Sequence, residues 1–108
     1  MDESSFNINV KEIIKNINHN TKAILPVHLF GNPSKMDQVC KIAKKHKLIV
    51  VEDACLAAGS MYKNKKIGSI GDITVFSTNP GKVLDGIGHG GIITTNSRKI
   101  FLKLKQLR

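Results

Sequence analysis

Polar side chains that could form a cofactor site follow two apolar runs of the sequence. Asp53 comes shortly after the run "LIVV", and Ser77 closes the run "ITVF". Lys82 follows in the glycine-rich segment "STNPGKVLDGIGHGG". In open α/β sheets, ligands bind beyond the carboxyl ends of the strands. The sequence therefore predicts that a carboxylate, a hydroxyl and an amine converge at one edge of a sheet.

Two phosphate-binding interpretations of the glycine-rich segment fail on spacing. A Walker loop, G-x-x-x-x-G-K-[ST], would need glycine at Phe76 and a hydroxyl residue at Val83. The letters from Gly86 to Gly91 do satisfy G-x-G-x-x-G, but the dinucleotide fingerprint needs a strand before it and a helix after it. Here a strand pattern follows, and no acidic residue lies about 20 positions further on. Both interpretations are therefore disfavoured.

The third interpretation is a reactive lysine. Lysine can form a Schiff base with an aldehyde, and a carboxylate keeps a ring nitrogen protonated so that the ring accepts electrons. Asp53, Ser77 and Lys82 together suit a cofactor with a cationic ring nitrogen, a phosphate and an aldehyde, which describes pyridoxal 5'-phosphate. The structural alternatives are a solvent-facing loop lysine, a strand-ending aspartate and a strand-end hydroxyl.

The first half of the chain predicts a strand-helix-strand unit. Apolar spacing indicates a helix over residues 9–17 with Asn9 as its cap, then a short strand in the proline-containing run 21–31. Ser34 is the expected N-cap of a helix extending to residue 46. The unbroken run "LIVV" then predicts a parallel strand covered on both faces.

The second half predicts a hairpin or loop excursion in "MYKNKKIGSIGD", a strand in "ITVFS" and another in "GIITTN". The connection between the last two holds no helical pattern, so we expect an antiparallel pair and a mixed sheet. Asn96 or Ser97 caps a last helix, which is expected to run to the final residue, as if a longer protein continued there.

Composition narrows the class of protein. The 108 residues suffice for one modest core, and no apolar stretch or basic leader predicts a membrane span or a signal peptide, so a cytoplasmic location is expected. The net charge of +9 invites nucleic-acid binding. Against that, Trp is absent and the lysines are scattered without aromatic stacking platforms, so a solvated lysine surface is favoured.

The remaining histidines and cysteines suggest structural roles. His28 is expected to pack at a strand end, and the other histidines show no ligand spacing, so no metal site is predicted. Cys40 and Cys55 form no CxxC pair, which predicts free thiols. Cys55 either lines the cofactor face or is a small core residue.

Several stretches in this order resemble the DegT/DnrJ/EryC1/StrS family of sugar aminotransferases. They are "TKAILPVHLFG", "MDQVCKIAKKHKLIVVEDA", "IGSIGDITVFS", "PGK" and "GHGGIITTN". The most specific are "ED" after a strand and "S-x-x-x-x-K" ending at Lys82. The resemblance implies an α/β fold of the aspartate aminotransferase type, with a mixed, mostly parallel sheet and flanking helices. Residues 1–108 would form a single partial domain, the central portion of the large domain.

The resemblance also implies roles for the site residues. Lys82 would hold pyridoxal 5'-phosphate as a Schiff base and shuttle a proton, Asp53 would pair with the pyridinium nitrogen, and Ser77 would bind the phosphate. The implied substrates are a nucleotide-linked keto sugar and an amino donor, often glutamate, and the implied assembly is a homodimer. Related dehydratases carry histidine in place of this lysine, so Lys82 favours amino transfer.

Three positions depart from the family's pattern. Leu56 stands where relatives commonly carry Gln or His near the cofactor's phenolic oxygen, Ala58 where histidine is frequent, and His89 at an acidic position. Leucine cannot hydrogen-bond the cofactor. Members of the family are also several times longer and carry further parts of the active site. We therefore expect a fragment of the enzyme, with a non-catalytic remnant or interaction piece as the alternative.

Overall fold

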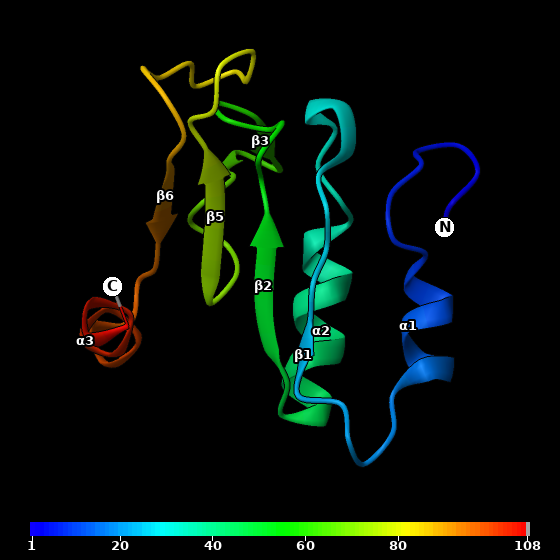
Figure 1. Cartoon of the computed structure of the whole chain (residues 1–108). Helices are drawn as coiled ribbons and strands as arrows, with labels where there is room; N and C mark the ends of the chain where they lie inside the picture. Colours follow the sequence, from blue (N-terminus) through cyan, green and yellow to red (C-terminus); the bar gives the residue numbers. More distant parts are fainter. Residues whose placement is uncertain (108) are drawn as a thin grey trace.

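The computed structural model describes residues 1–107, which form a four-stranded sheet with its main helix on one face (Figure 1). A strand-helix-strand unit comes first, made of β1 (Ala23–Ile24), α2 (Met36–His46) and β2 (Ile49–Asp53). β1 pairs in parallel with β2, with Ile24 opposite Val50. This confirms the predicted unit, and a crossover helix is what joins adjacent parallel strands in such units.

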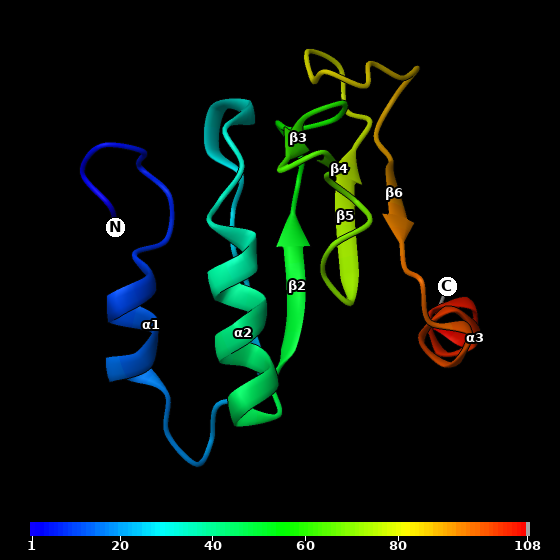
Figure 2. The same ribbon diagram turned by 180° about the vertical axis from the view of Figure 1, so that it is seen from behind.

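Helix α2 covers one face of the sheet because its apolar residues recur at helical spacing. Met36, Val39, Ile42 and Ala43 are buried. Its lysines gather in the exposed last turn, where cations are favoured by the helix dipole. Figure 2 shows the molecule from behind, with α2 in front of the β1 segment and next to β2.

Helix α1 (Val10–Asn16) packs against α2. Asn9 caps it as predicted, because its side-chain oxygen accepts a hydrogen bond from the backbone N–H of Lys11 at 2.9 Å. Ile13 is the buried residue of this helix. A short 3₁₀ turn, η1 (Leu29–Gly31), leads from the β1 segment towards α2.

The predicted N-cap of α2 is wrong. Lys35 occupies the cap position and makes no capping side-chain bond. Ser34 is buried, and its hydroxyl donates instead to the carbonyl of Val27 at 3.0 Å. A buried hydroxyl needs a partner, and here a tertiary contact takes the group that a cap would have used.

A small antiparallel hairpin follows β2, made of β3 (Met61–Tyr62) and β4 (Lys65–Lys66). Lys63 and Asn64 have φ of 46° and 63°, the left-handed values that a tight two-residue hairpin turn requires. The predicted excursion is therefore a hairpin. Lys63 and the Tyr62 hydroxyl also bind the Asp37 carboxylate, which ties the hairpin to α2.

The sheet is completed by β5 (Ile73–Ser77) and β6 (Gly91–Thr94), and the chain continues into α3 (Arg98–Gln106). The strand order is β1-β2-β5-β6; β5 is parallel to β2 and β6 is antiparallel to β5, so the sheet is mixed as predicted. Ser97 caps α3 by accepting from the N–H of Ile100. The predicted continuation of this helix to residue 108 lies outside the described residues.

The predicted cover on both faces of β2 is wrong for residues 1–107. Val50 and Glu52 are buried on the face that α2 covers, whereas Ile49 is exposed and Val51 and Asp53 are half-buried on the other face. Figures 1 and 2 agree that none of the helices formed by residues 1–107 covers the second face. None of the helices formed by residues 1–107 is long and apolar enough to cross a membrane.

Candidate cofactor site

The three predicted site residues lie at the same edge of the sheet. Asp53 ends β2 and Ser77 ends β5, and the two strands are parallel neighbours with Asp53 opposite Val75. The loop that carries Lys82 lies beyond the arrowheads of both strands (Figure 1). The topology therefore brings the carboxyl ends of the two strands and the loop together, which is where open α/β sheets bind ligands.

Asp53 is held firmly by its backbone. Its N–H donates to the carbonyl of Pro26 and its own carbonyl accepts from the N–H of His28, both at 2.9 Å. Its side chain is half-buried, and Oδ1 accepts a hydrogen bond from the N–H of Cys55 at 3.0 Å. A carboxylate fixed in this way can present a hydrogen-bond acceptor to a cationic ring nitrogen with little reorganisation.

Ser77 begins a turn that shapes the loop. Its Oγ accepts a hydrogen bond from the N–H of Asn79 at 3.2 Å. Among residues 1–107 the hydroxyl donates to no acceptor, so its proton is available to an anion. Ser77 also pairs with Gly91 across β5 and β6, which closes the loop at its base.

The two residues after Ser77 organise the loop, and the sequence analysis did not single them out. Thr78 exchanges backbone bonds with the two arms of the loop, since its N–H donates to Gly90 and its carbonyl accepts from Gly86. The side chain of Asn79 accepts a hydrogen bond from the N–H of Gly90 at 3.1 Å. Their position directly after a strand could have revealed this role from the sequence, because Asn and Thr side chains often form hydrogen bonds with nearby backbone groups in turns.

Lys82 lies in the turn that Asn79 begins, with its N–H donating to the carbonyl of Asn79 at 3.1 Å. Gly81, just before it, has a φ of 83°, a left-handed conformation that favours glycine. Lys82 is half-buried and forms no salt bridge with any other residue of the described part. Its amine is therefore uncommitted within residues 1–107.

Cys55 lies two residues after Asp53 and donates its backbone N–H to that carboxylate. Burial raises the pKa of its thiol, and the neighbouring Asp53 carboxylate raises the same pKa further by hydrogen bonding and by charge. The positive charge of Lys82 and the backbone of Ser77 act on the same sulfur in the opposite direction. Cys55 is half-buried and lies next to the Asp53 carboxylate at the end of β2.

The three residues that depart from the family pattern, Leu56, Ala58 and His89, lie in two different segments. Leu56 and Ala58 are half-buried in the segment that follows Asp53, and His89 is exposed in the glycine-rich loop. His28 is fully buried and its ring binds Glu52, so the expected packing of His28 at a strand end fits the structure. Cys40 and Cys55 are free thiols, as expected.

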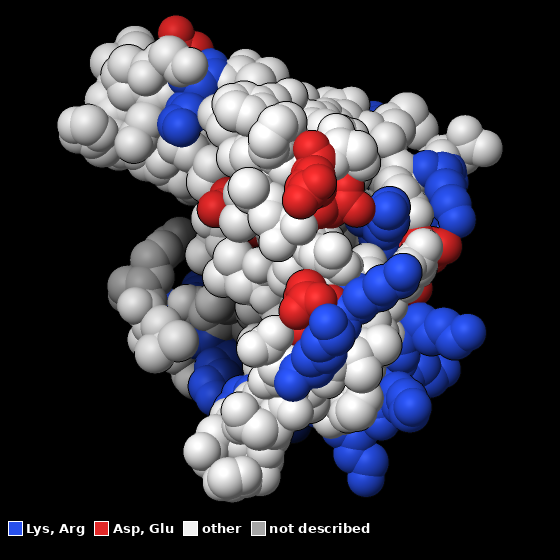
Figure 3. Space-filling model, turned by 90° about the vertical axis from the view of Figure 1, so that its right-hand side faces the viewer, with Lys and Arg blue, Asp and Glu red and all other residues white. Residues whose placement is uncertain are grey.

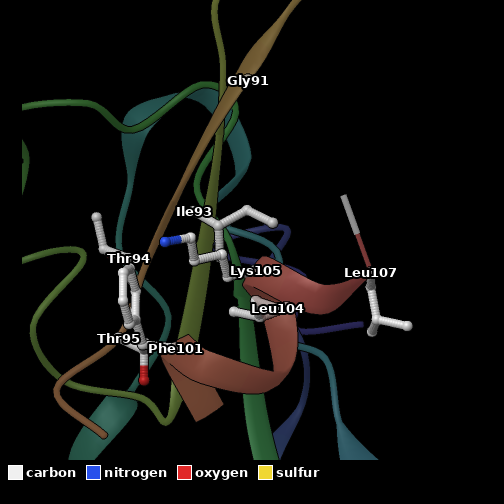
Figure 4. Close-up of a pocket in the computed structure, with 8 residues that line it drawn as sticks. All are labelled: Gly91, Ile93, Thr94, Thr95, Phe101, Leu104, Lys105 and Leu107. Atoms are coloured by element: carbon white, nitrogen blue, oxygen red, sulfur yellow. The ribbon is translucent and has the colours of Figure 1, made fainter. Parts of the chain in front are cut away.

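A cavity of about 750 Å³ lies away from these residues, between β6 and α3 (Figure 4). Apolar side chains, among them Ile93, Phe101 and Leu104, line it together with Lys105. It contains no carboxylate and no part of the glycine-rich loop before Gly91. This cavity is a mostly apolar groove at the sheet edge and offers no carboxylate for the ring nitrogen of a cofactor.

The basic charge does not form one continuous surface on the face shown in Figure 3. Most of the blue basic side chains lie in the lower right of the view, and white and red areas separate them from a second blue group at the upper left. Among the ion pairs of the described part, Lys15, Lys35 and Lys63 are each paired with a carboxylate. This face therefore lacks the basic stripe that is typical of nucleic-acid binding.

Comparison with solved structures shows that the chain has the fold of the large class of pyridoxal-phosphate-dependent aminotransferases. The aminotransferase from Psychrobacter cryohalolentis matches with a TM-score of 0.94 and 38% identity, covering 97% of this chain and 27% of that one. NtdA from Bacillus subtilis, solved with the cofactor PMP bound, matches with a TM-score of 0.84 and 37% identity, covering 93% and 22%.

The chain belongs to the DegT/DnrJ/EryC1/StrS aminotransferase family, whose sequence profile matches residues 1–108. GDP-perosamine synthase from Caulobacter vibrioides is 41% identical over 107 residues, which are 99% of this chain and 29% of the relative. The expected family and fold are confirmed. The chain spans less than a third of the length of these relatives.

Proposed function

We propose that this chain carries the cofactor-holding segment of a pyridoxal-phosphate-dependent aminotransferase that acts on a nucleotide-linked keto sugar. One observation carries the proposal: Asp53 and Ser77 end neighbouring parallel strands at the same edge of the sheet, and the loop that carries Lys82 begins directly after Ser77. The activity named for a relative, GDP-perosamine synthesis, supports a nucleotide sugar as the substrate class. Glutamate is the proposed amino donor.

The residues present fit pyridoxal 5'-phosphate. The cofactor needs an amine for its aldehyde, an anion for its ring nitrogen and hydrogen-bond donors for its phosphate. Lys82 offers an uncommitted amine, Asp53 a carboxylate fixed by Cys55, and Ser77 a hydroxyl with a free proton. When bound, the cofactor supplies an electron-accepting ring that stabilises negative charge on the substrate carbon.

Each residue then has a defined task. Lys82 would hold the cofactor through Nζ, and the same amine would serve as the base that moves a proton at the substrate carbon. Asp53 keeps the ring nitrogen protonated by pairing its negative charge with it. Ser77 donates its hydroxyl proton to a phosphate oxygen. Lysine rather than histidine at position 82 favours amino transfer over dehydration.

We further propose that residues 1–108 are the central part of one large domain. The matched relatives are more than three times as long, so sugar recognition and a homodimer interface are assigned to the complete enzyme. The alternative is a chain that has kept the fold without the chemistry. Leu56 favours that alternative, because it offers no hydrogen bond to the cofactor.

The test is a titration of the 108-residue chain with pyridoxal 5'-phosphate, followed by borohydride reduction and mass mapping of the modified lysines. We expect modification concentrated at Lys82, and we expect Lys82→Ala to lower total fixation by about tenfold, because an anchored amine is far more reactive than scattered surface amines. Lys66→Ala is the matched control, since Lys66 is an exposed lysine of the hairpin.

The two explanations give different labelling patterns. If the cofactor is still fixed in Lys82→Ala, or if it is fixed evenly over the surface lysines, the assignment of Lys82 is rejected. That result favours the alternative of a chain that has kept the fold but not the catalytic function. Selective fixation in the parent chain and in Lys66→Ala supports the proposed function.

A further inference from the structure

Behind the candidate site, on the opposite face of β2, lies a buried pair of polar side chains. His28 and Glu52 are both 0% exposed, and Nε2 of His28 lies 2.9 Å from Oε2 of Glu52. Successive residues of a strand point to opposite faces. Glu52 therefore points away from the site while Asp53, the next residue, points towards it.

The partners of His28 define its tautomer. The backbone N–H of Ser34 donates to Nδ1 of His28 at 3.1 Å, so Nδ1 must be the acceptor nitrogen. The ring proton then lies on Nε2 and is donated to the Glu52 carboxylate. This hydrogen bond is charge-assisted, because the acceptor is ionised.

The other oxygen of Glu52 is also fully engaged. Oε1 accepts from the N–H of Gly71 at 2.6 Å and from the Thr74 hydroxyl at 2.8 Å. A side chain at Gly71 would place its Cβ 2.9 Å from both Cγ and Oε1 of Glu52, so only glycine allows this approach. The carboxylate thus links three segments: the one after β1, the turn before β5, and β5 itself.

His28 forms hydrogen bonds with two adjacent residues at the end of β2. Its ring binds the side chain of Glu52, and its backbone N–H donates to the carbonyl of Asp53 at 2.9 Å. Apolar side chains of similar volume often replace buried charged groups without loss of stability. A requirement for stability alone would therefore not need a buried His–Glu pair at this place. A requirement for a fixed direction of the Asp53 side chain would need it.

We propose that His28 and Glu52 are positioning residues for Asp53. The buried pair fixes the carboxyl end of β2 from the face opposite to the site, so that the Asp53 carboxylate is held where it meets the ring nitrogen of the cofactor. This inference rests on the proposed function for its purpose, but its structural effect is measurable without any cofactor.

The test uses amide hydrogen exchange by NMR on the cofactor-free chain. The amide of Cys55 is the reporter, because it donates directly to Oδ1 of Asp53. We expect His28→Ala to accelerate its exchange about tenfold beyond any change in the slowest, globally exchanging amides. His28→Gln, which keeps a donor for Glu52, is expected to restore most of the protection. Val39→Ala, another fully buried site under the same sheet, is the matched control.

Thr74→Val provides a milder second variant should His28→Ala fail to fold, because it removes one donor to Glu52 with almost no change in volume. We expect a smaller but selective acceleration at Cys55. If Val39→Ala accelerates Cys55 exchange as much as the His28 and Thr74 variants do, the pair is an ordinary part of the core and the inference is overturned.

A second experiment, with pyridoxal 5'-phosphate added, distinguishes failure of this inference from failure of the proposed function. In a chain that binds pyridoxal 5'-phosphate, His28→Ala should weaken selective fixation at Lys82 while His28→Gln retains it. If the parent chain shows no selective fixation, the proposed function fails on its own, and the exchange result still decides whether the pair positions Asp53.

Discussion

At the scale of single residues, Thr78 and the glycines around it set the shape of the loop. A Cβ at Gly90 would lie 2.8 Å from the Thr78 hydroxyl, and one at Gly86 would lie 2.8 Å from the Thr78 carbonyl. Both glycines therefore allow the loop to close on the residue after β5. Lys82 is carried by that loop, so the placement of its amine depends on this closure.

Gly90→Ala tests that dependence. We expect it to lower selective fixation of pyridoxal 5'-phosphate at Lys82 by about tenfold, since misplacement of about 1 Å in a binding site can cost far more than the contact itself. Mass mapping after reduction measures the effect. Adding Thr78→Ala removes the clashing oxygen and should recover part of the fixation, and Thr78→Ala alone is the control. If the double variant recovers nothing, steric closure on Thr78 is not the cause.

At the scale of elements, the two first helices begin in different ways. α1 begins with a local cap, because Asn9 bonds the second residue that follows it. α2 begins without one, because the Ser34 hydroxyl is used in a tertiary contact to Val27. The start of α1 is thus determined locally, and the start of α2 depends on its packing against the β1 segment.

Asn9→Ala is expected to lower the free energy of unfolding by about 0.5–2 kcal/mol, the usual cost of losing an N-cap. The effect reaches global stability because Ile13 of the same helix is buried in the core. Urea denaturation followed by circular dichroism measures it. Asn9→Ser keeps a capping oxygen and should remain within a few tenths of a kcal/mol of the parent. Equal losses in both variants would contradict the role of the cap.

At the scale of the whole molecule, one buried carboxylate links the strand-helix-strand unit to the second half of the sheet. Burial of Glu52 raises its pKa, but hydrogen bonds from His28, Gly71 and Thr74 outweigh that effect and leave the pKa below its ordinary value of 4.5. A carboxyl group whose pKa is lowered on folding stabilises the protein above its unfolded-state pKa. That contribution is lost as the pH falls through the lower, folded-state pKa.

Stability should therefore fall in acid, and Glu52→Gln should flatten part of that fall. We expect the free energy of unfolding of the parent to decrease below about pH 4.5, by up to about 1.4 kcal/mol per pH unit for this one group. Urea denaturation from pH 6 to pH 3 measures both proteins. Asp37, with its pKa lowered to about 2 by Lys63 and Tyr62, contributes equally to both curves. Parallel curves would show that Glu52 does not carry the acid dependence.

The sequence by itself predicted most of the elements and proposed three candidate site residues. Local patterns placed both central strands, the hairpin and the cap of α1. The order of residues along the chain also placed Asp53, Ser77 and Lys82 at strand ends and in a glycine-rich loop. Such features depend on neighbours in the chain, so periodicity and turn chemistry can reveal them.

Only the tertiary structure decided which distant residues become the hydrogen-bond partners of the polar side chains. The Ser34 hydroxyl binds the Val27 carbonyl instead of capping α2, the Cys55 N–H binds the Asp53 carboxylate, and the His28 ring binds Glu52. It also left the second face of β2 uncovered by any helix of residues 1–107, which the apolar run alone did not predict. These outcomes depend on which segments meet in space, and a buried polar group takes whichever partner the packing brings within reach.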